Sequence, residues 1–462
     1  MPQSFYLTEK SKQSVTPIIL LSDTQYEAWL KKQPPHTRAW LAATQFKASA
    51  GNVSLVPAPS GGITQVVACV DSPLNVWSIA HLATALPTAH YDIDAKLTPA
   101  QATDLALGWA LSTYQFTKYK EGKKSFATLV APTGTDMEYV QAMAESICWA
   151  RDLINTPAGD MHPEALAEEA VAWAQEAKGK VRVIKGEQLL KSNYPMIYTV
   201  GKAATVPPHL VDIHFPKKGA PKITLVGKGV CFDSGGLDIK NTAGMKLMKK
   251  DMGGAANVLA LAKAIIDTGL AVELRVLLPI VENAIAGNAM RPLDIIKTRK
   301  GITVEIGNTD AEGRLILCDA LTEADSGKPD LLIDCATLTG AARVALGTDI
   351  PAFFTHDDAL AESLSKASTR KHDPLWRLPL HSAYRSQLDS PNADLSNDPD
   401  SGYGGAITAA LYLNEFVSRT TPWIHIDMMA WNPKSRPGRL VGGEAMGIRA
   451  VYSMIKERYG KR

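Results

Sequence analysis

The chain has 462 residues, of which 45% are hydrophobic and 21% are charged. This length predicts more than one domain, and the composition excludes a disordered or collagen-like chain. The 49 lysine and arginine residues nearly balance the 47 acidic residues, so the net charge of +2 favours neither nucleic acid nor an anionic membrane as a partner.

The cysteines and the apolar runs indicate where the protein acts. Five cysteines without a CxxC motif are too few for a disulfide scaffold of this size, so we expect reduced thiols. No apolar run approaches the length of about 18 residues that a membrane span needs. The sequence MPQSFYLTEKSKQ at the start has no apolar core typical of a signal sequence. We therefore expect a cytoplasmic protein without a membrane partner.

The first part of the chain, residues 1–135, is predicted to be a small α/β domain. Short apolar runs typical of strands alternate there with amphipathic stretches typical of helices. The apolar runs cover 18–21, 65–70 and 126–130, and the amphipathic stretches cover 26–32, 77–85 and 100–119. The turn-forming sequence PTGT is the predicted end of this domain. No motif in this part points to chemistry.

A linker helix is predicted next, within residues 136–160. Val140, Met143 and Ile147 recur at helical spacing, and the sequence Asn-Thr-Pro at 155–157 is expected to end the helix. This helix would join the first domain to a larger second one.

The second part, residues 161–462, alternates strand-like runs with helix-like stretches. This alternation predicts a larger α/β domain with a mainly parallel, helix-flanked mixed sheet. The clearest predicted helix covers 254–267 and ends before Gly269. Sites in such folds usually lie at the carboxyl ends of the strands. The predicted strands cover 181–184, 196–199, 223–226, 272–281, 303–306, 331–334 and 423–428.

Ionisable residues are concentrated in three segments that follow predicted strands, namely 226–236, 237–254 and 306–315. Burying charge there is costly unless something compensates it. In an extended segment, residues two apart project to the same side, so Asp310 and Glu312 are expected to face one centre. Two carboxylates so close repel each other unless a cation lies between them. The sequence therefore predicts a cation site.

Two neighbouring features support a hydrolytic centre. Glycines at 307 and 313 allow the backbone to approach the cation without a side-chain clash. Arg314 falls near the start of a predicted helix, where free backbone N–H groups and the helix dipole favour a bound anion. A cation site beside an anion site is typical of a hydrolytic centre.

Each of these patterns also has a simpler interpretation. A single DxE or DSGG sequence more often marks a cap, a turn or a surface pair than a site. The sequence GKGVCFDSGG lacks the Lys-Ser/Thr pair of a phosphate-binding loop. Without an HExxH motif, His425 is expected to be an interior residue and not a metal ligand. Lys246, Lys249 and Lys250 are expected to meet solvent or to balance nearby carboxylates, with substrate contact as the alternative.

The motifs together carry a family resemblance. Residues 308–315 read NTDAEGRL, and residues 226–236 read VGKGVCFDSGG. Lys240 lies eleven residues before Asp251, which opens the sequence DMGGAA, and ATLTGA follows at 336–341. The chain thus resembles the M17 leucyl aminopeptidases, also called cytosol aminopeptidases, over most of its second part.

The resemblance implies a two-metal exopeptidase that removes the N-terminal amino acid from peptides, with the catalytic site in the second domain. One cation would be held by Lys228, Asp233, Asp251 and Glu312, and its neighbour by Asp233, Asp310 and Glu312. Lysine is an unusual ligand because it must be neutral, and only a nearby cation favours its deprotonation. The oxygen-rich ligand set suits Mn²⁺, Mg²⁺ or Zn²⁺, and the family favours zinc or manganese.

The resemblance also implies two catalytic residues and an assembly. Lys240 would stabilise the developing oxyanion. Arg314 would hold a bicarbonate that shuttles a proton from the nucleophilic water. Because relatives assemble as two trimers, a homohexamer acting on peptides is expected.

The substrate pocket departs from the family pattern. Met248, Thr337 and Gly340 match positions that line the side-chain pocket of relatives. After the last strand, relatives show small residues in a pattern close to DIAGTAW, whereas this chain has DMMAWNP at 427–433. Met429 is expected to narrow or reshape the pocket, so a preference for leucine does not follow.

Two other functions stay open. Some bacterial relatives bind DNA as hexamers, but the near-neutral composition does not favour a DNA-binding, regulatory hexamer with secondary peptidase activity. A two-metal hydrolase of another ester or amide, such as a phosphate ester, would use the same carboxylates. The sequence does not identify the native metal, the preferred side chain, the physiological substrate or the role of the first domain.

Overall fold

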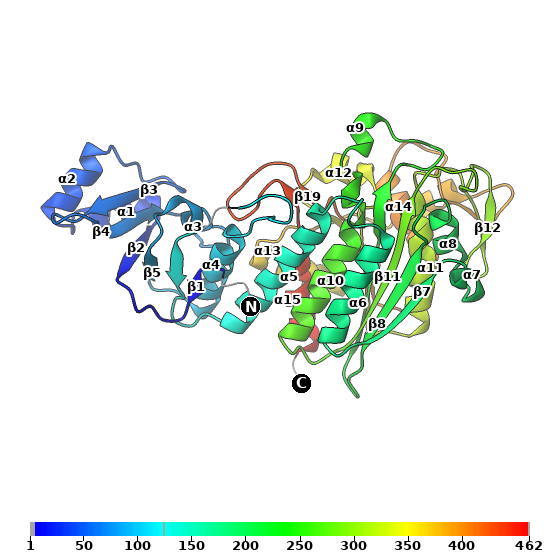
Figure 1. Ribbon diagram of the computed structural model, residues 1–462, viewed down its shortest axis with the longest axis horizontal. Helices are drawn as coiled ribbons and strands as arrows, with labels where there is room; N and C mark the ends of the chain where they lie inside the picture. Colours follow the sequence, from blue (N-terminus) through cyan, green and yellow to red (C-terminus); the bar gives the residue numbers. More distant parts are fainter. Residues whose placement is uncertain (1–4, 123–124, 461–462) are drawn as a thin grey trace. The chain divides into compact units, whose positions relative to one another are not determined.

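The computed structural model describes residues 5–122 and 125–460 (Figure 1). The chain forms two compact units. The first unit comprises 1–148 together with 434–440, and the second comprises 149–433 together with 441–462. Helix α5 (Met137–Asn155) contributes residues to both.

The first unit contains a six-stranded sheet with helices, as the alternating apolar runs predicted. Neighbouring strands are parallel except for the antiparallel pair β3 and β4. Ile18, Tyr91 and Trp109 are fully buried in its core. The strand order is β1 (Leu7–Thr8), β6 (Thr128–Val130), β5 (His90–Asp94), β2 (Val15–Leu21), β4 (Ile63–Cys69), β3 (Val53–Pro57). The helices are α1 (Asp23–Leu30), α2 (Pro35–Ala43), α3 (Leu82–Ala85) and α4 (Pro99–Ser112).

The second unit is built on a nine-stranded mixed sheet, in which parallel pairs outnumber antiparallel ones. Most strands follow the order β16 (Trp376–Arg377), β15 (Ala352–Phe354), β18 (Trp423–Asp427), β14 (Leu331–Ala336), β9 (Lys222–Gly227), β11 (Glu273–Asn283), β8 (His209–Phe215), β7 (Lys180–Lys185). The ninth strand, β10 (Gly229–Asp233), pairs with the end of β11. The predicted fold class is confirmed.

Helices cover both faces of this sheet (Figure 1). Helices α6 (Pro163–Glu176) and α10 (Gly253–Asp267) pack on one face, and α8 (Pro195–Gly201) and α11 (Glu312–Ser326) pack on the other. On the α8 and α11 face, Val226 and Leu277 of the strands share one buried cluster with Leu317 of α11. This apolar layer fixes the strand ends that carry the candidate site.

Smaller elements complete the second unit. A three-stranded sheet joins β12 (Ile295–Lys297), β13 (Thr303–Glu305) and β17 (Leu395–Ser396), and β19 (Trp431–Asn432) pairs with β20 (Gly442–Gly443). The remaining helices are α7 (Gln188–Lys191), α9 (Thr242–Met245), α12 (Gly340–Leu346), α13 (Asp358–Lys371), α14 (Gly405–Asn414), α15 (Ile448–Tyr459) and the 3₁₀ helices η1 (Met248–Met252) and η2 (Ser382–Leu388).

Two sequence-based predictions for this unit were wrong. The run 196–199, predicted as a strand, lies in helix α8, because Pro195 occupies the first helical turn, where its fixed φ favours a helix start. The run 303–306 does form a strand, β13, but this strand belongs to the small sheet and not to the nine-stranded one. In the described part of the chain, no helix is both long and apolar enough to cross a membrane.

Candidate metal centre

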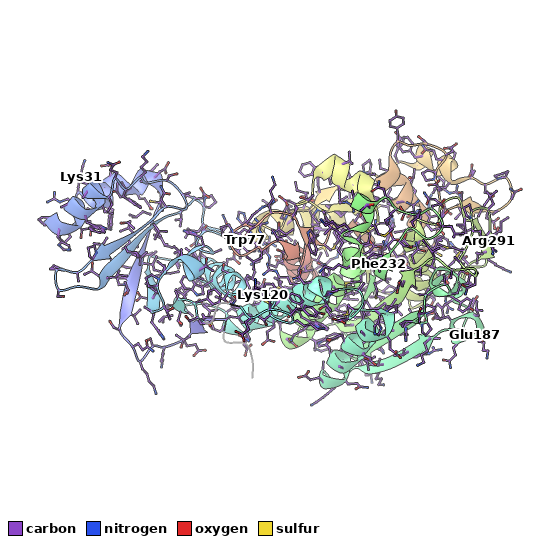
Figure 2. The ribbon with its side chains drawn as sticks, turned by 45° about the horizontal axis from the view of Figure 1, so that its top comes forward. Lys31, Trp77, Lys120, Glu187, Phe232 and Arg291 are labelled. Carbon is purple, nitrogen blue, oxygen red and sulfur yellow. The ribbon has the colours of Figure 1, made fainter. Side chains whose placement is uncertain are left out.

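The first segment of the candidate site lies at the end of strands β9 and β10. Lys228 connects the two strands and Asp233 ends β10; each is 2–3% exposed. Figure 2 marks this place by Phe232, the residue before Asp233. Gly227 is required beside Lys228, because a Cβ there would lie 2.6 Å from the Cα atom of Ala255 at the start of α10. The sequence thus places two ionisable residues in a closely packed interior.

The second segment brings Asp251 to the same place. Asp251 lies in η1 immediately before α10 and is 2% exposed. Its Oδ1 atom accepts a hydrogen bond of 2.7 Å from the Thr337 hydroxyl, which fixes the carboxylate. Gly254 lets α10 begin close to β14, since a Cβ there would lie 2.4 Å from the carbonyl oxygen of Cys335.

The third segment contributes Asp310 and Glu312, but not from an extended strand as predicted. Asp310 lies in a turn and Glu312 is the first residue of α11. The side chain of Asn397 holds this turn by accepting hydrogen bonds from the backbone N–H groups of Gly307 and Asn308. The two carboxylates face one centre because a turn leads directly into a helix.

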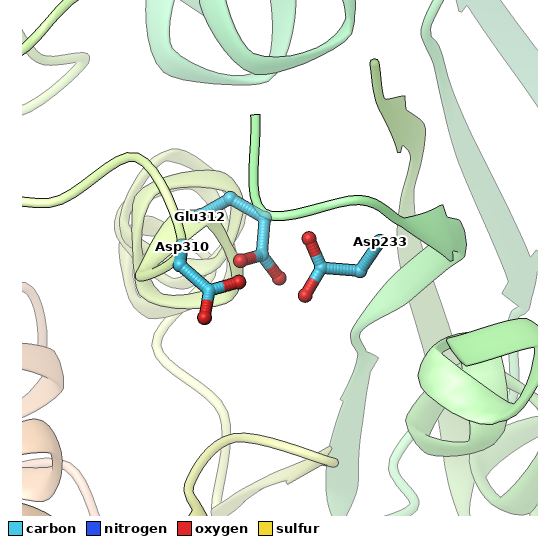
Figure 3. A group of neighbouring side chains, drawn as sticks. All are labelled: Asp233, Asp310 and Glu312. Atoms are coloured by element: carbon cyan, nitrogen blue, oxygen red, sulfur yellow. The ribbon is translucent and has the colours of Figure 1, made fainter. Parts of the chain in front are cut away.

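Three of the carboxylates converge (Figure 3). Carboxylate oxygens of Asp233, Asp310 and Glu312 all lie within 4.8 Å of one another. Figure 3 shows Asp233 opposite the other two, with the carboxylate groups directed toward a common space. The sequence-based prediction that Asp310 and Glu312 face one centre is confirmed, with Asp233 as the third member.

Two lysines lie among the carboxylates. Lys228 Nζ is 2.7 Å from Asp251 Oδ2 and 3.0 Å from Glu312 Oε1. Lys240 Nζ is 2.8 Å from Asp233 Oδ2 and also contacts Asp310. Two ammonium groups against four carboxylates leave an excess of two negative charges.

The excess negative charge shifts the ionisation of the cluster. Burial, with the nearby charge of Asp233, raises the pKa of Glu312 well above its usual range and that of Asp310 to about 6. Burial opposes ionisation of Asp251, but the adjacent Lys228 outweighs it and lowers its pKa. Burial also disfavours the charged form of Lys228, yet Asp251 and Glu312 raise the pKa of this lysine. The protein alone does not compensate all four carboxylates.

The donor set fits a divalent cation. Asp251 Oδ2 and Glu312 Oε1 are buried beside Lys228, yet neither accepts a well-directed hydrogen bond from any residue that the structure describes. Buried carboxylate oxygens of this kind are normally hydrogen-bonded or coordinated. Oxygen ligands with one amine and no thiolate or imidazole suit Mn²⁺, Mg²⁺ or Zn²⁺.

Family models match both units of the chain. The catalytic domain of the cytosol aminopeptidase family matches residues 148–452, and the N-terminal domain of M17 aminopeptidases matches residues 16–132. The chain belongs to the M17 cytosol aminopeptidase family. The sequence-based resemblance is therefore confirmed, and the protein is an aminopeptidase that removes N-terminal residues from peptides.

Individual M17 relatives agree with this family assignment. Peptidase B of Cronobacter sakazakii is 44% identical over 319 residues, which cover 67% of this chain and 74% of that protein. Peptidase B of Serratia proteamaculans is 40% identical over 365 residues, covering 76% and 83%. The crystal structure of a cytosol aminopeptidase from Coxiella burnetii has a TM-score of 0.95 and 44% identity, covering 98% of this chain and 99% of the other.

A further M17-like structure carries a metal. The bottromycin maturation enzyme BotP in complex with Mn has a TM-score of 0.85 and 32% identity, covering 96% of this chain and 99% of the other. The M17 family is metal-dependent, in agreement with the carboxylate cluster found here.

Arg314 of this aminopeptidase is buried in the first turn of α11. Its Nη1 atom donates a hydrogen bond of 2.7 Å to the carbonyl oxygen of Asn397, and its Nε atom has no partner among the described residues. Burial lowers the pKa of the guanidinium group. A buried arginine with a free donor is suited to bind an anion.

The lysines that follow Lys240 differ in their surroundings. Lys246 is exposed, as expected. Lys249 donates a hydrogen bond to the carbonyl oxygen of Asn155 and lies 5.5 Å from the ring centre of Trp431. Lys250 is only 2% exposed, so it does not meet solvent, and burial lowers its pKa to about 8.

His425 is an interior residue of this aminopeptidase, as the sequence indicated. It is fully buried, and its Nδ1 atom lies 2.6 Å from Asp334 Oδ1. Trp423 donates to the other oxygen of Asp334. The His425 Nε2 atom has no partner in the described part of the chain, so the residue is only half satisfied.

The predicted pocket residues lie on three segments. Met248 begins η1, Gly340 begins α12 and half-buried Met429 follows β18. Thr337 is the only one of the four for which a bond to a candidate ligand was found among the described residues, because its hydroxyl donates to Asp251.

Sequence reasoning missed Asn283, which holds Asp233. The Asn283 Nδ2 atom donates to Asp233 Oδ1 at 2.9 Å and to the carbonyl oxygen of Thr309 at 3.1 Å. One amide thus ties the first segment to the third. A signal did exist, since Asn283 lies two residues after the predicted strand 272–281, and sites are expected at the ends of such strands.

Proposed function

We propose that this aminopeptidase cleaves the N-terminal peptide bond with two divalent cations, Mn²⁺ or Zn²⁺, held by the carboxylate cluster. Lys228, Asp233, Asp251 and Glu312 would hold one cation, and Asp233, Asp310 and Glu312 would hold the other. The observation that carries this proposal is the convergence of the three carboxylates within 4.8 Å. The buried Asp251 Oδ2 and Glu312 Oε1 atoms, which accept no well-directed hydrogen bond from the described residues, support it.

Held by these residues, a cation pair would supply Lewis-acid polarisation of the scissile carbonyl group and a water molecule of lowered pKa as the nucleophile. Lys228 must give up its proton to act as a ligand, and the positive charge of a cation favours that loss. Asn283 and Thr337 keep Asp233 and Asp251 in orientation through the hydrogen bonds described above.

Two residues would act on the reacting groups directly. We assign to Lys240 a hydrogen bond to the oxyanion that develops on the substrate carbonyl, because its side chain remains 15% exposed at the cluster. We assign to Arg314 a site for bicarbonate, which would accept the proton of the attacking water. The free Nε donor of Arg314 and its lack of an ion pair with any described carboxylate support this anion site.

The substrate pocket and the assembly are part of the same proposal. The side chain of the substrate's N-terminal residue would be surrounded by Met248, Thr337, Gly340 and Met429.

We further propose a cytoplasmic homohexamer. All five cysteines are buried and none forms a disulfide within the described residues, which suits a reducing compartment. Large exposed apolar side chains, including Val344 at 90% and Leu293 at 71%, suit contacts between subunits.

Substrate assays with defined metal content test this function. We expect protein stripped by a chelator to be inactive, and Mn²⁺ or Zn²⁺ to restore cleavage of leucine anilide. The N-acetylated anilide should resist cleavage, because an aminopeptidase requires a free amine. A phosphate ester serves as the control substrate and should stay intact. Equal cleavage of the blocked anilide, or full activity without metal, would contradict the proposal.

A further inference from the structure

A cavity lies in the second unit, away from the carboxylate cluster. It has a volume of about 380 Å³, within the range of small-molecule sites. Its walls come from strands β7, β8, β11 and β9 and from Gly327, the residue after α11. The lining side chains include Lys180, Arg182, Asp212, His214, Lys222, Thr224, Glu273 and Arg275.

The strand register places these side chains on one face of the sheet. Lys180 pairs with His214, which pairs with Arg275, which pairs with Thr224 on the next strand. Residues two apart on a strand share a face. The cavity side chains therefore lie on the same face of the sheet that α8 and α11 cover toward the carboxyl ends of β7 and β9. There the same strands carry buried apolar residues, Ile184, Leu210, Leu277 and Val226. The cavity therefore begins where α11 ends and the helical cover stops.

The carboxylates of the cavity already have partners. Asp212 accepts hydrogen bonds from Arg275 Nε at 2.9 Å and Nη2 at 2.8 Å, and Arg275 is 2.7 Å from Glu323 as well. Glu273 lies 3.2 Å from His214 Nε2. Arg275 thus pairs with Asp212, and Glu273 shares a hydrogen bond with His214.

Three basic side chains remain without an acidic partner. Within the described residues, Lys180, Arg182 and Lys222 form no ion pair through their side chains, although all three line the cavity. Three unpaired cations around one concave space attract an anion that carries more than one charge. Arginine adds the two parallel donors that suit phosphate or carboxylate oxygens.

We propose that this cavity is a binding site for a small multivalent oxyanion, distinct from the peptide-cleaving centre. Lys222 begins β9 and Lys228 follows its end, so at about 3.3 Å per residue six steps, or about 20 Å, separate Lys222 of the cavity from Lys228 of the carboxylate cluster. An anion here would leave the carboxylate cluster free for substrate. Phosphate esters and dicarboxylic acids share the required chemistry.

Calorimetric titration of the full-length, metal-loaded protein tests the site. Sulfate serves as the probe for the phosphate class and malonate as the probe for dicarboxylates, at constant ionic strength. We expect one of them to bind saturably, and Arg182→Ala and Lys222→Ala each to weaken that binding about tenfold, the loss of one charge-assisted hydrogen bond. The matched control is Lys191→Ala, an exposed lysine outside the cavity, which should bind like the unmodified protein.

The possible outcomes distinguish phosphate compounds from dicarboxylates as the ligand. They also distinguish binding in this cavity from binding elsewhere on the protein. Saturable sulfate binding that both variants weaken assigns the site to phosphate compounds, and the same result with malonate assigns it to dicarboxylates. Binding that survives unchanged in a variant that combines Arg182→Ala and Lys222→Ala belongs to another place on the protein and overturns the proposal. The absence of saturable binding of either probe overturns it too. Loss of peptide cleavage in the metal assay above would refute the proposed function without affecting this test.

Discussion

Replacing Asp233 by asparagine should lower kcat/KM for leucine anilide by about a thousandfold or more, with the fold retained. Asp233 is the carboxylate that both cations would share, so the change removes a charged ligand from each. The asparagine side chain has nearly the same shape as aspartate. Its Oδ1 atom can still accept the hydrogen bond from Asn283. Steady-state kinetics at saturating Mn²⁺, with circular dichroism as the check on folding, measure the effect.

The matched control is Asp267→Asn. Asp267 ends α10 and pairs with Lys263 on the helix surface, outside the cluster. We expect this variant to keep kcat/KM within about twofold, because surface ion pairs contribute little. An Asp233→Asn enzyme with more than a tenth of the original activity would show that the shared ligand is misassigned.

The second large effect is a loss of stability when Lys228 is replaced in metal-free protein. Lys228→Met should lower the free energy of unfolding by about 3–5 kcal/mol, the usual cost of removing one partner from a buried ion pair. Lys228 and both of its carboxylate partners are almost completely buried, so Asp251 and Glu312 would lose their nearest positive charge. Urea denaturation in the presence of a chelator measures the loss.

The pH dependence of this loss has a definite sign. Without Lys228, the pKa of Asp251 in the folded state is no longer lowered by this lysine, and the pKa of Glu312 in the folded state rises further above its unfolded value. The folded variant then binds more protons than the unfolded chain, so its stability falls as pH rises through that window. The deficit should therefore be small in acid and full near neutral pH. Lys263→Met, which breaks the pair with Asp267 on the helix surface, should cost at most about 1 kcal/mol. An equal cost for both variants would contradict the role given to Lys228.

Local sequence signals predicted the regular elements where they were strong. The helix predicted over 254–267 is α10, which begins one residue earlier and ends at the predicted residue, because four apolar residues at helical spacing and a following glycine determine it locally. The run 196–199 was misread as a strand because four apolar residues show no period of their own. Strand β8 was not predicted at all, although it lies between β11 and β7 in the sheet.

The candidate site was predictable only in part. Motif positions indicated Asp233, Asp310 and Glu312, yet the expected extended geometry was replaced by a turn and a helix start. Asn397 could not be recognised, because its bonds to Gly307 and Asn308 join residues about ninety positions apart. Such contacts depend on tertiary proximity, which no local pattern encodes. The same holds for the buried Nε atom of Arg314, which has no hydrogen-bond partner among the described residues.

Anomalous scattering from crystals equilibrated with Mn²⁺ tests the central claim most directly. We expect two peaks per chain at the cluster, both beside Asp233 and Glu312, one adjoining Lys228 and Asp251 and the other adjoining Asp310. Crystals saturated with Mn²⁺ that show no peak at these carboxylates, or a single peak that does not touch Asp233, would contradict the two-metal account.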